Sequence, residues 1–85
     1  MSKKATKAAL KTIKSISELI SKEKPDYGNV ETEITNLKGI VPSICGDDWL
    51  EVNEKIETLI KTIKEKQRPK KYIQQLAKVK LKWLK

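Results

Sequence analysis

The chain has 85 residues and a net charge of +8, from 19 Lys and Arg against 11 Asp and Glu, with one cysteine and no histidine. This length fits a single domain, and a lone cysteine excludes a disulfide-stapled fold. Because histidine is the commonest general base and metal ligand, its absence leads us to expect a protein that is not an enzyme and holds no metal or cofactor.

Residues 3–24 form the first predicted helix, which has an apolar side and a basic side. Its apolar positions recur every three or four residues, the period of an amphipathic helix. These positions are Ala9, Ile13, Ile16 and Ile20. Lysines repeat at the same spacing on the opposite side, at Lys3, Lys7, Lys11 and Lys14. Pro25 and Gly28 predict the turn that ends this helix.

Residues 29–41 form the second predicted helix, and Pro42 ends it because proline lacks an amide donor. Its apolar positions are Val30, Ile34, Leu37 and Val41. Cys45 lies in the loop that follows. We expect it to be a small buried hydrophobic residue rather than a reactive or dimer-linking thiol.

Residues 48–67 form the third predicted helix, which has the clearest start in the chain. Asp48 followed by Glu51 is a capping-box pattern, in which the two side chains satisfy free amide groups at a helix start. The apolar positions of this helix share one side. They are Trp49, Val52, Ile56, Leu59, Ile60 and Ile63. Pro69 then breaks the helix, since it lacks an amide donor and disfavours helical angles at the residue before it.

Residues 70–84 form the fourth predicted helix, which is amphipathic and strongly basic. Its apolar side comprises Tyr72, Ile73, Leu76, Ala77, Val79, Trp83 and Leu84. A basic stripe on this helix comprises Lys71, Lys78, Lys82 and Lys85. Lys80 falls within the apolar side, where a lysine stem can pass apolar neighbours and reach water. Leu10, Leu50 and Leu81 lie off the apolar stripes of their helices and are candidate surface contacts.

Four amphipathic helices joined by short loops predict an all-α fold. The expected architecture is a small four-helix, largely antiparallel bundle that forms a single domain over residues 1–85. Pro69 allows the C-terminal helix to be skewed against the other helices. The two lysine stripes could merge into one basic patch, but the sequence does not reveal whether they do.

Charge is segregated along the chain, which bears on the partner rather than on the fold. Residues 1–24 hold seven lysines against two acids, and residues 68–85 hold seven basic residues and no acid. Residues 25–50, by contrast, hold five acids against one lysine. Arg68 is the sole arginine. Since base-specific recognition relies heavily on arginine, any binding of nucleic acid is expected to be independent of sequence.

These features predict a cytoplasmic, non-enzymatic protein of regulatory, inhibitor or immunity type that docks on another protein through the basic faces of residues 3–24 and 70–84. The predicted contact residues are Lys3, Lys7, Lys11, Lys14, Arg68, Lys71, Lys78, Lys82 and Lys85. One alternative is a sequence-independent nucleic-acid-binding accessory protein, since lysine stripes can track phosphates. A second is association with an anionic membrane surface through residues 70–84, a cationic amphipathic segment with Trp83 near its end.

Overall fold

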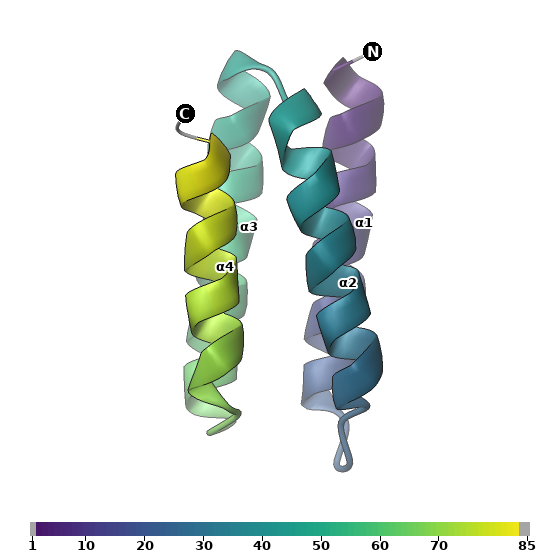
Figure 1. Ribbon diagram of the computed structural model, residues 1–85, viewed down its shortest axis with the longest axis vertical. Helices are drawn as coiled ribbons and strands as arrows, with labels where there is room; N and C mark the ends of the chain where they lie inside the picture. The colour runs from purple at the N-terminus through teal and green to yellow at the C-terminus, as the bar shows by residue number, and fades with distance from the viewer. Residues whose placement is uncertain (1, 84–85) are drawn as a thin grey trace.

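The computed structural model describes the backbone of residues 2–83 and the side chains of residues 3–81, and this part of the chain forms four α-helices and no strand. The helices are α1 (Ser2–Ser21), α2 (Tyr27–Ile40), α3 (Gly46–Glu65) and α4 (Lys70–Trp83), with a short 3-10 helix, η1 (Val41–Ser43), after α2. Helices consecutive in the chain run antiparallel (Figure 1). The prediction of an all-α four-helix bundle is confirmed.

The apolar stripes of the helices meet in one hydrophobic cluster, which is the core. The stripes predicted for the first two helices are buried. In α3, all of the predicted positions are buried except Ile60, which is half-buried against the core. In α4, Tyr72, Leu76 and Val79 are buried, whereas Ala77 is exposed, contrary to the prediction. The side chain of Trp83 and all of Leu84 lie outside the described residues.

The order of the helices around the bundle differs from their order in the chain. Within residues 2–83, α1 packs against α2 and α3, and α4 packs against the same two helices. In that range no Cα atom of α1 lies within 8 Å of one in α4, and none of α2 lies within 8 Å of one in α3. These two pairs therefore lie across the diagonals of the bundle, as Figure 1 shows. As a result α1 and α3 are parallel neighbours, as are α2 and α4.

The connection between α2 and α3 crosses one end of the bundle along a diagonal and closes that end of the core. It consists of η1 and the two residues after it, and η1 contacts α1, α2 and α4. Val41 and Ile44 from this connection are buried. Cys45 is exposed, so the prediction that it is buried is wrong. The reason is that the extended residue Cys45 lies immediately before α3, while Ile44 takes the place in the core.

The turn between α1 and α2 is organised by Asp26. Its Oδ1 accepts a hydrogen bond from the Asn29 amide (3.2 Å), and its Oδ2 accepts one from Asn29 Nδ2 (2.7 Å). An aspartate in this position caps free amides of the first helical turn. Helix α2 consequently begins at Tyr27, two residues before the predicted start, and α1 ends at Ser21, three residues before its predicted end.

Helix α3 begins at Gly46, so the predicted capping box at Asp48 is wrong. The residue before the helix, Cys45, makes no side-chain capping hydrogen bond. Gly46 has a φ of +40°, in the left-handed region that favours glycine, and this lets the helix begin earlier. Asp48 instead lies in the first turn, where its Oδ2 accepts a hydrogen bond from Thr6 Oγ1 of α1 (2.9 Å).

The turn between α3 and α4 is a Schellman motif. The amide of Arg68 donates to the Ile63 carbonyl (3.1 Å), and the amide of Gln67 donates to the Lys64 carbonyl (3.1 Å). This pattern places one residue in the left-handed region, here Gln67 with a φ of +54°. Pro69 follows the motif and precedes α4, which lies alongside α3 rather than skewed across it (Figure 1). The turn thus reverses the chain within four residues, 66–69.

Candidate docking site

The outer side of α1 carries a row of unpaired lysines, which we call the α1 basic face. It comprises Lys3, Lys4, Lys7, Lys11 and Lys14, all of which are exposed. The core side of the same helix is occupied by its buried isoleucines, so these lysines lie on the side of α1 away from the core, with Lys14 at the edge toward α3. None of them forms an ion pair with a described residue, and the first acid in the chain is Glu18.

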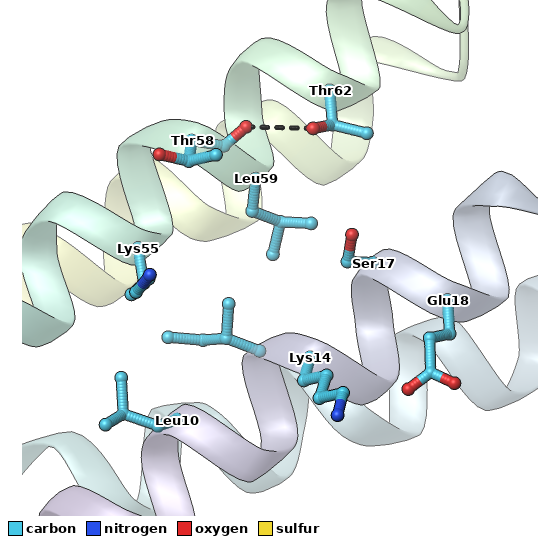
Figure 2. A pocket seen from close by; sticks show the side chains of 9 residues that line it. Leu10, Lys14, Ser17, Glu18, Lys55, Thr58, Leu59 and Thr62 are labelled. Carbon is cyan, nitrogen blue, oxygen red and sulfur yellow. Dashed lines mark hydrogen bonds between the residues drawn. The ribbon is translucent and has the colours of Figure 1, made fainter.

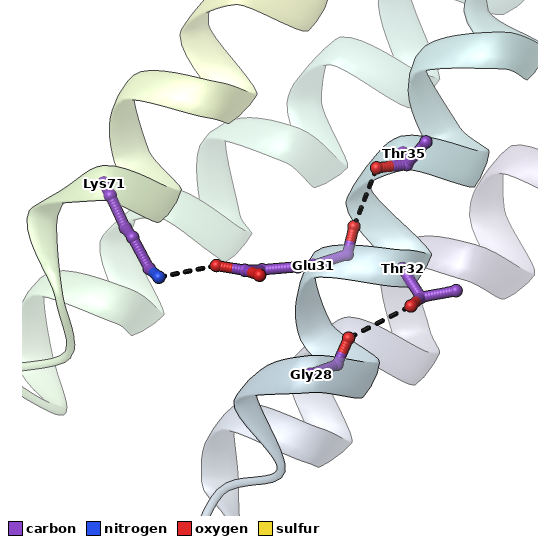
Figure 3. A network of polar contacts seen from close by, with 5 residues as sticks. All are labelled: Gly28, Glu31, Thr32, Thr35 and Lys71. Atoms are coloured by element: carbon purple, nitrogen blue, oxygen red, sulfur yellow. Dashed lines mark hydrogen bonds and ion pairs between the residues drawn. The ribbon is translucent and has the colours of Figure 1, made fainter.

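Two lysines of α4 are in a different position, because acids on neighbouring helices pair with them. Lys71 Nζ lies 2.5 Å from Glu31 Oε1 of α2 and 5.3 Å from the centroid of the Tyr72 ring (Figure 3). The hydrogen bond to Glu31 raises the pKa of Lys71 above its usual range. The ammonium group of Lys71 therefore already has an anionic partner inside the bundle.

Lys80 forms the second ion pair of α4. Its ammonium group contacts the Glu57 carboxylate of α3, and this hydrogen bond lowers the pKa of Glu57. The lysine that interrupted the apolar side of the helix thus reaches an acid at the boundary of the core. Lys78 is exposed in the groove between α2 and α4. The side chain of Lys82 and all of Lys85 lie outside the described residues.

The two predicted lysine stripes do not come together. Helices α1 and α4 lie on a diagonal of the bundle and make no contact over residues 2–83, so their outer sides face away from one another. A single flat partner surface cannot cover both sides at once. The α1 basic face and the lysines of α4 are therefore separate surfaces. Among the described residues, Lys71 and Lys80 of α4 have bound acids, whereas Lys78 and the lysines of the α1 basic face have none.

Arg68, another predicted contact residue, is used inside the fold. Its Nε donates to the Ile20 carbonyl (3.2 Å) and its Nη2 donates to the Lys22 carbonyl (2.9 Å). These are carbonyls at the C-terminal end of α1, which lack partners within the helix. The fork of a guanidinium group can serve two such acceptors at once. Arg68 is half-buried in this position and binds α1 to the turn between α3 and α4.

Beside the α1 basic face, an apolar groove of about 360 Å³ runs between α1 and α3. Figure 2 shows the side chains of Leu10 and Leu59 pointing into the space between the two helices. Lys14 and Lys55 also line it. The sequence identifies Leu10 as a candidate surface contact because it lies off the apolar stripe of its helix. Nothing in the sequence indicates that Lys55 and Leu59 line a groove. They could be identified only once α3 was known to lie beside α1.

Among residues 2–83, no group of three His, Cys, Asp or Glu side chains is arranged to hold a metal ion. In the same range no helix combines the length and the apolar character needed to cross a bilayer. The apolar residues Tyr72, Leu76 and Val79 of α4 face the core rather than the surface. Comparison of the chain with protein-family models, curated proteins and solved structures finds no match.

Proposed function

We propose that this protein is a non-enzymatic docking protein, of regulatory, inhibitor or immunity type, which binds another protein through the α1 basic face. The observation that carries the proposal is the contrast between the two basic helices. Two lysines of α4, Lys71 and Lys80, have acidic partners on neighbouring helices, whereas no lysine of α1 pairs with a described residue. An unpaired row of charge is available to orient a partner during association.

Two features favour a protein partner over nucleic acid. The first is the apolar groove beside the α1 basic face, because apolar surface is what the centre of a protein interface buries. The second is the acidic outer surface of the neighbouring helix α3, where Asp47, Glu51 and Glu54 are exposed. A uniform polyanion that extended from α1 over this surface would be repelled by these carboxylates, whereas a protein can place acids against the lysines and bases against the carboxylates.

The test uses a quadruple variant of α1 in which Lys3, Lys7, Lys11 and Lys14 are replaced by glutamine. Tagged wild type and variant are used to capture partners from a nuclease-treated extract of the cells that produce the protein. We expect the wild type to retain a specific protein and the variant to lose most of it. Replacing Lys38, Lys61, Lys70 and Lys78, which are exposed lysines on the other helices, by glutamine is the matched control and should not reduce capture.

Equal capture by wild type and the quadruple α1 variant would contradict the proposal. A gel shift with a random-sequence duplex tests the nucleic-acid alternative directly. If four lysines of α1 bound phosphates, log K would fall against log salt with a slope of about −3.6. Tight duplex binding with such a slope, and no captured protein, would assign the α1 basic face to nucleic acid instead.

A further inference from the structure

The groove between α1 and α3 is bounded by contacts at both ends. At one end, Thr6 of α1 donates a hydrogen bond to Asp48 of α3 (2.9 Å). At the other, Arg68 in the turn after α3 donates to the Ile20 and Lys22 carbonyls at the end of α1. Between these contacts the two helices leave the groove of about 360 Å³. The groove thus lies between two sets of hydrogen bonds that join α1 to α3 and to the turn after α3.

The surface of this groove is mainly apolar, and two of the polar residues that line it are satisfied within their own helix. Leu10, Ile13 and Leu59 contribute side chains from the two helices. Thr58 and Thr62 also line it, but their hydroxyl groups donate to the Glu54 carbonyl (3.1 Å) and the Thr58 carbonyl (3.0 Å), respectively, within α3. A threonine hydroxyl that is satisfied by its own helix does not need water. The groove can therefore be covered by apolar groups without leaving these hydroxyls unpaired.

The charges around the groove are mainly positive. Lys14 lines it from α1 and Lys55 lines it from α3, and neither is in an ion pair. The rest of the α1 basic face continues along the outer side of the same helix. Glu18 is the single acid among the lining residues. A partner with apolar residues at its centre and carboxylates at its margins would be complementary to this surface.

We infer that the groove between α1 and α3 binds an acidic amphipathic helix of a partner protein, an inference that rests on the proposed docking function. On α1, the lining residues run from Leu10 to Glu18, a helical length of about 12 Å. Apolar residues at positions i, i+3, i+4 and i+7 of a bound helix span about 10.5 Å, so one such row fits. Carboxylates beside the row would meet Lys14 and Lys55.

A second copy of the chain fits less well. Its acidic helix surface on α3 presents Asp47, Glu51 and Glu54, but Leu50 is the one large apolar side chain that α3 exposes there, at 67%. A single leucine does not supply the row of anchors that the groove can hold. The partner helix is therefore expected to come from another protein.

The inference can be tested with a display library of helical peptides. Each peptide has leucine fixed at positions i, i+3, i+4 and i+7, and the remaining positions are randomised. We expect enriched peptides to carry Asp and Glu beside the leucine row. Their affinities are then measured by fluorescence polarisation on wild type, on Thr58→Glu and on Thr32→Glu. Thr58 and Thr32 are both exposed threonines that donate to their own helix, and only Thr58 lines the groove.

A carboxylate at position 58 puts like charge against the acidic peptide, so we expect Thr58→Glu to weaken binding by about tenfold or more. Thr32→Glu should leave the affinity unchanged, and circular dichroism checks that both variants are folded. Lys55→Glu, at another exposed groove residue, replaces Thr58→Glu if that variant loses its helical spectrum. No enrichment, enrichment of basic peptides, or binding that is insensitive to the groove variant would overturn the inference. So would concentration-dependent self-association that Thr58→Glu abolishes.

These outcomes are distinct from failure of the proposed function. If the partner captured from cells is lost from the quadruple α1 variant but retained by Thr58→Glu, the result supports docking through the α1 basic face and contradicts the inference that the groove binds the partner. If it is lost from Thr58→Glu but retained by a variant in which only Lys3, Lys7 and Lys11 are replaced by glutamine, which keeps the groove residue Lys14, the groove binds the partner and the rest of the α1 basic face does not.

Discussion

Arg68, the sole arginine of the chain, donates two hydrogen bonds in fixed directions to backbone carbonyls at the end of α1. Arg68 serves the Ile20 and Lys22 carbonyls from a turn that is 46 to 48 residues away in sequence. Lysine carries the same charge but presents one ammonium group on a flexible stem, so it cannot reproduce both bonds in a fixed geometry. Helix capping therefore gives a physical reason for an arginine at this position.

Replacing Arg68 by lysine should reduce the free energy of unfolding by about 1–2 kcal/mol, since at least one bond from a charged donor is lost. Urea denaturation followed by circular dichroism measures this change. Lys70→Gln, at an exposed cation close to the same turn, is the control and should change stability by about 0.5 kcal/mol or less. A lysine variant as stable as wild type would show that the forked contact contributes nothing.

Tyr72 is a polar residue placed in the core without a hydrogen-bond partner. Its side chain is fully buried, and its hydroxyl has no partner in the described structure. Burial also raises the pKa of this hydroxyl, because the charged form would be poorly solvated. The ring itself stacks on Tyr27, with the ring centroids 5.8 Å apart. Burial of the apolar ring stabilises the core, whereas burial of the unpaired hydroxyl lowers the free energy of unfolding.

Tyr72→Phe should therefore increase the free energy of unfolding at neutral pH by about 1 kcal/mol, because it removes a buried unsatisfied hydroxyl and keeps the stacked ring. Thermal and urea denaturation both report the change. Tyr27→Phe is the matched control, since Tyr27 is 39% exposed and water can solvate its hydroxyl. If Tyr72→Phe were destabilising, the hydroxyl would have to be hydrogen-bonded in solution.

At the scale of elements, α4 is attached to its two neighbours by one ion pair each. Lys71 pairs with Glu31 of α2, and Lys80 pairs with Glu57 of α3. Both pairs are solvent-exposed to a large degree, so each is a weak contribution to stability. The ion pairs have a larger effect on the surface charge. Their carboxylates neutralise two of the lysines of α4, which is the most basic helix in the sequence.

The Glu57 pair also predicts a dependence of stability on pH. Lys80 lowers the pKa of Glu57 in the folded state. The contribution of the pair is thus fully present above the ordinary glutamate pKa of about 4.3 and is lost as the pH falls through the lower folded value. Glu57→Gln should show a shallower loss of stability on acidification than wild type, measured by urea denaturation at a series of pH values. Glu54→Gln, at an exposed carboxylate of the same helix without an ion pair, should retain the wild-type slope.

At the scale of the whole molecule, the diagonal order of the helices decides which surfaces exist. Because α1 and α3 are neighbours, a groove forms between them, and the outer side of α1 borders it. Because α1 and α4 are on a diagonal, the two lysine stripes remain apart. The same four helices in sequential order around the bundle would have placed α1 beside α4 and the stripes on adjoining helices.

Local periodicity in the sequence determined the four helices and their buried sides, since a stripe such as Ile13, Ile16 and Ile20 follows from helix geometry alone. It did not determine all of the ends. Asp26 and Gly46 start their helices earlier than the hydrophobic pattern indicated, because capping and a left-handed glycine act through the backbone.

Only the tertiary structure decided which helix each stripe packs against, because a stripe specifies that a side is buried but not its neighbour. The five-residue connection 41–45 crosses the end of the bundle and sets that choice. The ion pairs of α4, the role of Arg68 and the groove all join residues distant in the chain, so spacing in sequence could not reveal them. Contacts between helices, rather than residue composition, therefore give Lys71 and Lys80 of α4 acidic partners and leave the α1 basic face without one among the described residues.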